Sequence, residues 1–115
     1  MQTIKNRTKA FALRIIKLYS ALPSQTVAQV IGQNILSSGT SVGASYREAS
    51  RAEPTTEFIN KVNICIQNLE ATIYWLELLV EAEILPPEQL KSLLSEANEL
   101  IASLVSAVNR AELKQ

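Results

Sequence analysis

Four prolines constrain this chain more than any other feature, because a proline cannot continue a helix that reaches it. They stand at Pro23, Pro54 and the adjacent pair Pro86 and Pro87, and they divide the chain into four segments of about 20 to 30 residues. Apolar residues recur in every segment at the three- and four-residue spacing of a helix. The three glycines of the chain are too few for the turns of an all-β fold. Because short connections make consecutive helices antiparallel, the sequence predicts one all-α domain over residues 1–115, an antiparallel up-down-up-down four-helix bundle.

Hydroxyl side chains that follow the first two proline positions predict where two of the helices begin. Ser24 follows Pro23, and Thr55 and Thr56 follow Pro54. A hydroxyl at the N-cap position accepts a hydrogen bond from a backbone N–H of the first turn, so Ser24 and either Thr55 or Thr56 are predicted N-caps.

The first segment carries its apolar residues on one narrow stripe, in which Thr8 fills the only polar place. This stripe consists of Ile4, Phe11, Ile15, Leu18 and Leu22. Leu13 and Ile16 lie off it, among positively charged residues. The stripe is therefore predicted to face the core and the rest of this helix to form a cationic outer surface. The fourth segment has a core stripe of the same kind, made of Leu90, Leu93, Leu94, Ala97, Leu100, Ile101, Leu104 and Val108.

The third segment carries two apolar stripes instead of one. The main stripe consists of Phe58, Val62, Cys65, Leu69, Leu76 and Val80, and the second of Ile64, Ala71, Trp75, Leu78 and Ala82. A helix in a four-helix bundle ordinarily buries one stripe, so the second stripe predicts a contact between identical chains that includes Ile64, Trp75 and Leu78. The alternative is that both stripes belong to one broad core face of a central helix.

Small residues crowd positions 37–49, where the sequence reads SSGTSVGASYREA. A glycine inside a helix costs roughly 1 kcal/mol relative to alanine, so packing must compensate at Gly39 and Gly43. Their four-residue spacing places both on one helix face, which predicts close approach of a neighbouring helix. One alternative is a kink or a broken helix near Ser38. Another is a phosphate-binding loop, but the preceding strand and the loop lysine that such a loop requires are absent.

The absence of His and the presence of a single Cys exclude the commonest catalytic and metal-binding arrangements. Glu70, Glu77 and Glu81 share one face of the third segment, but without His the Glu-x-x-His pairs of di-iron bundles cannot form. Cys65 falls within the main apolar stripe, where a thiol behaves as a small core residue. We therefore expect no catalytic residue, no metal or other cofactor and no small-molecule substrate. The chain is not predicted to be an enzyme.

No stretch of about 18 residues is apolar enough to span a membrane, since the richest, IYWLELLVEAEIL, contains three glutamates. The N-terminal residues lack the apolar run and cleavage site of a signal peptide, and a lone Cys suits a reducing compartment. A cytoplasmic location without a membrane partner is expected.

The net charge of zero conceals two oppositely charged parts of the chain. Residues 1–47 contain six basic residues and no acid, whereas residues 48–115 contain five basic residues and all eleven glutamates. The six basic candidates for phosphate contact are Lys5, Arg7, Lys9, Arg14, Lys17 and Arg47. Repeated around a ring, they would attract nucleic acid without reading its sequence. Alternatively, the cationic first helix lies against acidic surface on the last helix or on a neighbouring subunit.

The run GTSVGASYREA, followed by residues 56–59 and then by NLEATIYWLELL, resembles the bacterial four-helix-bundle proteins encoded in intervening sequences of large-subunit ribosomal RNA genes. Relatives of that family include the accessory protein of diversity-generating retroelements. The resemblance covers the chain in order, and Ser45 stands where members often carry Asn. The residues on the family's pattern positions are Ser41, Tyr46, Glu48, Phe58, Glu70, Trp75 and Leu76.

This resemblance implies an antiparallel bundle assembled into a ring, typically a pentamer. It also implies a link to nucleic acid, since the retroelement relatives work beside a reverse transcriptase with basic surfaces. We expect a non-enzymatic, ring-forming structural or adaptor protein whose partner is a further copy of itself. The alternative is a nucleic-acid-binding accessory protein, associated with a retroelement or with ribosomal RNA, whose partners are RNA, DNA or a reverse transcriptase.

Overall fold

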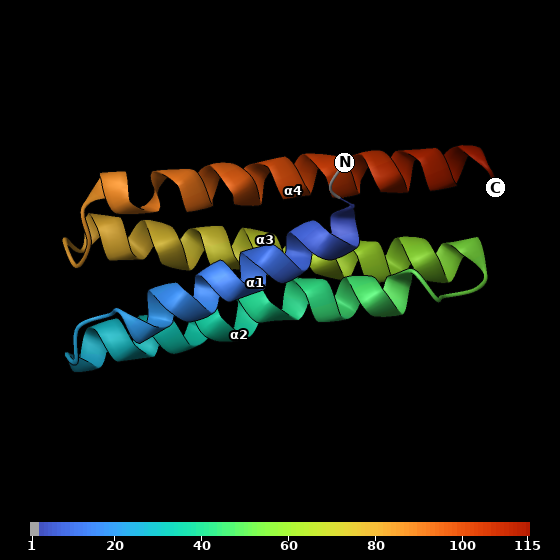
Figure 1. Cartoon of the computed structure of the whole chain (residues 1–115). Helices are drawn as coiled ribbons and strands as arrows, with labels where there is room; N and C mark the ends of the chain where they lie inside the picture. The colour runs from blue at the N-terminus through green and yellow to red at the C-terminus, as the bar shows by residue number, and fades with distance from the viewer. Residues whose placement is uncertain (1–2) are drawn as a thin grey trace.

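The computed structural model describes residues 3–115, in which four helices and no strand are found. Helix α1 covers Ile4–Ser20, α2 Thr26–Ala49, α3 Thr55–Glu81 and α4 Pro87–Leu113. Together they form a rod with extents of 48 × 23 × 21 Å. The α1–α2 and α3–α4 connections lie at one end of this rod, and the α2–α3 connection lies at the other (Figure 1). None of the helices in the described residues is both long and apolar enough to cross a membrane.

Each helix packs against two others. α2 contacts α1 and α3, α4 contacts the same two, and α1 and α3 lie on opposite sides of the core. Between α1 and α2, Gly43 lies beside Thr8 and Gly32 lies beside Tyr19. Helix α1 thus lies beside both α2 and α4.

The ends of the helices are built by different local interactions. The backbone N–H of Asn6 donates a 3.1 Å hydrogen bond to the Thr3 hydroxyl, which caps α1. The predicted caps of the next two helices are wrong, because Gln25 and Pro54 occupy the N-cap positions and neither side chain makes a capping bond. Thr55 is already the first helical residue of α3. At the end of α3, Glu83 adopts a left-handed φ of 59° and the chain turns back toward α4.

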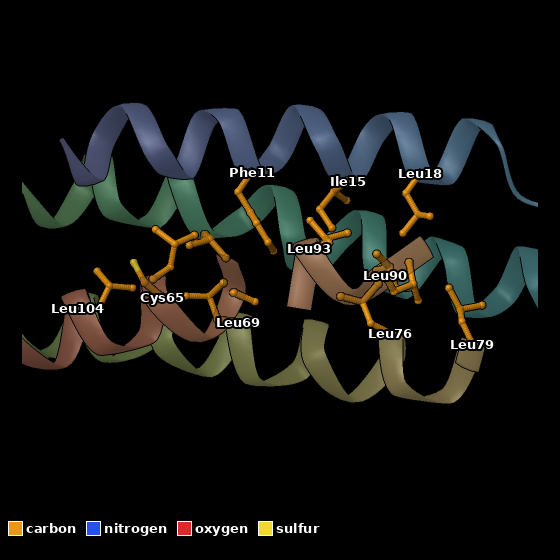
Figure 2. Close-up of a cluster of buried hydrophobic side chains, with 14 of the residues drawn as sticks. Phe11, Ile15, Leu18, Cys65, Leu69, Leu76, Leu79, Leu90, Leu93 and Leu104 are labelled. Carbon is orange, nitrogen blue, oxygen red and sulfur yellow. The ribbon is translucent and has the colours of Figure 1, made fainter. Parts of the chain in front are cut away.

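The core contains the stripes that periodicity predicts. Figure 2 shows Phe11, Ile15 and Leu18 of α1 projecting toward buried side chains of α3 and α4. The main stripe of α3 forms the opposite wall, with Val62, Cys65, Leu69 and Leu76 fully buried. Leu13 and Ile16, predicted to lie outside the core, are 59% and 45% exposed. In α4 the core residues include Leu90, Leu93, Leu100 and Leu104.

The small residues of α2 do allow α1 to approach closely, as their spacing predicts. A Cβ atom added to Gly39 would lie 2.8 Å from Cγ1 of Ile15, which is closer than side-chain atoms pack. At Gly43 the nearest atom would be the Thr8 hydroxyl oxygen, at 3.3 Å. Helix α2 is continuous across this stretch, so the alternative of a broken helix near Ser38 is wrong.

Candidate functional site

The six basic residues predicted to contact phosphate divide between two sides of α1. Arg7 and Arg14 face α4, whereas Lys5 and Lys9 face α2, from which Arg47 joins them. A helix advances about 100° per residue, so basic residues two positions apart point in very different directions. The predicted single basic surface is therefore two separate surfaces with different surroundings.

On the α4 side, the basic residues meet hydroxyls and carboxylates. Arg7 lies 3.4 Å from a carboxylate oxygen of Glu96 and donates a 3.2 Å hydrogen bond to the Ser103 hydroxyl. Arg14 donates a 3.0 Å hydrogen bond to the hydroxyl of Ser92. Lys17 is exposed and follows Arg14 by three residues, which places it on the same side of the helix. Part of the cationic first helix thus lies against the acidic last helix, as one of the two predicted alternatives requires.

On the α2 side, Lys5, Lys9 and Arg47 surround a groove of about 430 Å³ between α1 and α2, which we call the α1–α2 groove. The other residues that line it are small: Thr8, Ala12, Thr40, Gly43 and Ala44. All three cationic side chains are exposed. Within residues 3–115 the ion pairs are Arg7–Glu96 and Lys61–Glu48, so the three cations of this groove keep their charge unpaired by protein carboxylates. No acidic residue lines the groove in this described part of the chain.

A hollow of about 840 Å³ lies at the end of the bundle where the start of α1 meets the C-terminal part of α4. Its rim carries both signs of charge, with Arg110 and Lys114 near Glu53. Mixed charge gives it less attraction for a polyanion than the α1–α2 groove has. None of the predicted site residues lines it.

The residues predicted to join identical chains lie on the side of α3 that adjoins α2. Ile64 is 46% exposed, while Trp75 and Leu78 are half-buried and pack against the core. The ring of Trp75 meets that of Tyr74 edge-on, with centroids 5.3 Å apart. The second stripe is thus partly a flank of the core and partly an exposed surface.

Two apolar residues of α2, Val27 and Val30, extend this surface and were not predicted as site residues. They are 59% and 51% exposed, and Val27 shares a small hollow with Ala82, the last residue of the second stripe. Both lie off the core positions Ala28 and Ile31, which is the sequence signal that could have indicated them.

The acidic residues weighed as candidate ligands are spread over the surface. Glu70, Glu77 and Glu81 are all exposed. Glu48 lies 3.4 Å from the Lys61 ammonium, which links α2 to α3. Among residues 3–115, no cluster of three His, Cys, Asp or Glu side chains lies close enough to hold a metal ion.

Comparison with known proteins now places this bundle in a family. The family model of the 23S rRNA-intervening sequence protein matches residues 2–106. The chain belongs to the 23S rRNA-intervening sequence protein family. This confirms the family resemblance based on GTSVGASYREA and NLEATIYWLELL.

A solved structure supports the same placement of this 23S rRNA-intervening sequence family member. The chain is similar to a protein of unknown function from the S23 ribosomal protein family of Bacteroides thetaiotaomicron, with a TM-score of 0.87 and 39% sequence identity. The match covers 92% of this chain and 98% of that one. No curated protein matches the chain.

Proposed function

We propose that this protein is a non-enzymatic structural or adaptor protein, an antiparallel up-down-up-down bundle whose copies assemble into a ring. The observation that carries the proposal is an exposed apolar surface made by two helices, which we call the α2–α3 strip. It consists of Val27, Val30, Ile64, Trp75 and Leu78. Five subunits is the number that the family resemblance implies.

The geometry of α3 places Trp75 and Leu78 on the side of the helix that adjoins α2. Thr72 is buried, and its hydroxyl lies 2.7 Å from that of Ser38, which fixes the side of α3 that faces α2. Trp75 follows Thr72 by three residues and Leu78 follows Trp75 by three, so they continue outward along that side. Apolar surface of this kind, joined across two helices and rimmed by polar residues, is typical of contacts between proteins.

Sedimentation velocity at micromolar concentration tests the assembly. We expect one species several times heavier than the 12.7 kDa chain. Replacing Val30→Lys and Ile64→Lys together should shift it toward the monomer, because two buried unpaired charges oppose association. Leu13→Lys and Ile16→Lys together are the matched control, since these residues are 59% and 45% exposed on the outer side of α1. A 12.7 kDa wild-type species, or a double variant that stays assembled, would contradict the proposal.

A second candidate function is that of a nucleic-acid-binding accessory protein. It is favoured by the α1–α2 groove, where three exposed cations from two helices converge with no carboxylate among them. Such a site attracts a polyanion through its phosphates.

Fluorescence anisotropy with labelled RNA and DNA tests this second function. We expect binding that is independent of sequence and that weakens steeply as salt rises, because each phosphate contact releases condensed counterions. If neither RNA nor DNA binds at about 50 mM salt, where the electrostatic attraction is strong, the second function is excluded.

A further inference from the structure

The α1–α2 groove has cations on both walls and, among residues 3–115, no carboxylate in its lining, whereas the hollow between α1 and α4 places Arg14 and Lys91 among glutamates. Lys5 and Lys9 come from one helix and Arg47 from the other, and residues no larger than threonine form the floor between them. Long cationic side chains beside a shallow floor can close over an extended anion from two sides. This arrangement narrows the class of ligand further than net charge does.

We infer that the α1–α2 groove binds the sugar–phosphate backbone of a single nucleic-acid strand, and that it contacts phosphates without reading bases. The inference rests on the second function proposed above and names its site and ligand. The three cations are the phosphate contacts, and the small, exposed side chain of Ala44 leaves room for the backbone beside them.

The dimensions of the groove favour a single strand over a duplex. Neighbouring helices pack with their axes about 8–10 Å apart, and the glycines of α2 hold α1 and α2 close. A duplex is stiff, with a persistence length of about 150 base pairs, so it cannot bend its phosphates into a short groove between two such helices. A single strand presents its phosphates on a narrow, flexible chain.

The residues that line the groove also indicate that bases are not read. No aromatic side chain lies among them in the described part of the chain, so no platform for base stacking is present. The small floor offers no amide or carboxylate side chain that could pair with base edges. Affinity should therefore depend on charge and strand form, not on sequence.

The α4 side of α1 is a poor alternative site for the same strand. The hollow that contains Arg14 and Lys91 is also lined by Glu88, Glu96 and Glu99. These carboxylates repel phosphate, and Glu96 already neutralises Arg7. The two sides of α1 therefore supply an internal comparison between cations with and without acidic neighbours.

The test uses fluorescence anisotropy with labelled oligothymidylate and oligoadenylate of about ten nucleotides, within the site sizes usual for single-strand binding. Three phosphate contacts predict that the logarithm of the affinity falls with the logarithm of salt concentration with a slope of about −2 per occupied groove. We expect similar affinities for the two oligomers and weaker binding of a duplex of equal length.

Two variants and a control assign the site. Lys5→Gln, Lys9→Gln and Arg47→Gln combined should lower the affinity about tenfold or more and flatten the salt dependence. Ala44→Leu should also weaken binding, because it fills the groove without changing its charge. The control removes three cations on the α4 side, through Arg14→Gln, Lys17→Gln and Lys91→Gln, and should retain most of the affinity.

The outcomes separate this inference from the function on which it rests. If oligonucleotides bind but the control weakens binding as much as the groove variant, or Ala44→Leu has no effect, nucleic-acid binding stands and the groove is not its site. Preference for the duplex overturns the single-strand assignment. If the wild-type chain binds no oligonucleotide at about 50 mM salt, both the inference and the second function fail. Circular dichroism confirms that each variant is folded.

Discussion

The thiol of Cys65 shows how burial can raise the pKa of one side chain. Cys65 is fully buried in the main stripe of α3, as its place in the sequence predicts. Its Sγ donates a 3.4 Å hydrogen bond to the backbone carbonyl of Lys61. Burial raises the pKa of the thiol from 9.0 to about 11, the backbone hydrogen bond opposes this rise, and the negative charge of Glu48 adds to it. The thiol therefore remains protonated and unreactive at neutral pH.

This raised pKa predicts that folding stability falls as alkali is added. Between pH 9.0 and about 11 the unfolded chain has lost the thiol proton while the folded chain keeps it. The stabilising contribution is thus fully present below pH 9.0 and is lost as the pH rises through about 11, by up to roughly 1.4 kcal/mol per pH unit. In urea unfolding, the stability advantage of the wild-type chain over Cys65→Ala should shrink across this range. A constant difference would show that the thiol does not titrate in this way.

At the scale of the element, α2 combines a weak intrinsic helix with strong packing. Its glycines reduce helix propensity, but they form the surface on which Ile15 and Thr8 of α1 rest. The sequence predicts this close approach because glycines four residues apart must share a face. It does not predict the N-cap residues of α2 and α3 correctly, because which residue near a proline starts a helix depends on how the preceding loop is held.

The two central glycines should respond differently to alanine. In Gly39→Ala the new Cβ would meet three atoms of the Ile15 side chain at 2.8–3.2 Å, so we expect a loss of about 1–3 kcal/mol in the free energy of unfolding. In Gly43→Ala the nearest atom is at 3.3 Å, and the gain in helix propensity, up to about 1 kcal/mol, should leave stability unchanged or improved. Urea unfolding of both variants measures the contrast. Equal destabilisation of the two would contradict the packing described for Ile15.

At the scale of the whole molecule, the bundle brings its oppositely charged parts together along one seam. Helix α1 carries five of the six basic residues of the first 47, and α4 is the neighbour that carries Glu88, Glu96 and Glu99. Arg7 and Arg14 contact α4, but other basic residues do not, because α1 also borders α2. Lys5 and Lys9 lie in the α1–α2 groove with Arg47, where they are exposed.

The seam predicts a measurable but small coupling between Arg7 and Glu96. Their side chains are each 24% exposed, so water still screens the pair, and a double-mutant cycle with Arg7→Gln and Glu96→Gln should give about 0.2–1 kcal/mol. The same cycle on Lys61 and Glu48, of which Glu48 is 67% exposed, should give less. Both couplings should decrease at high salt. A larger coupling for the Lys61 pair would contradict this ranking.

The sequence by itself determined the four helices, the inward stripes of α1, α3 and α4 and the small face of α2, because all of these follow from local periodicity and from proline. Tertiary structure decided which neighbour each remaining face meets. An inward stripe fixes only the direction of the core, and bundles of either hand, with α2 on one side of α1 or on the other, bury the same stripe. The handedness of this bundle is what turns Arg7 and Arg14 toward the carboxylates of α4 and leaves Lys5 and Lys9 beside Arg47. Spacing along α1 separates these two pairs but does not say which neighbouring helix each pair meets, so the groove became visible only in three dimensions.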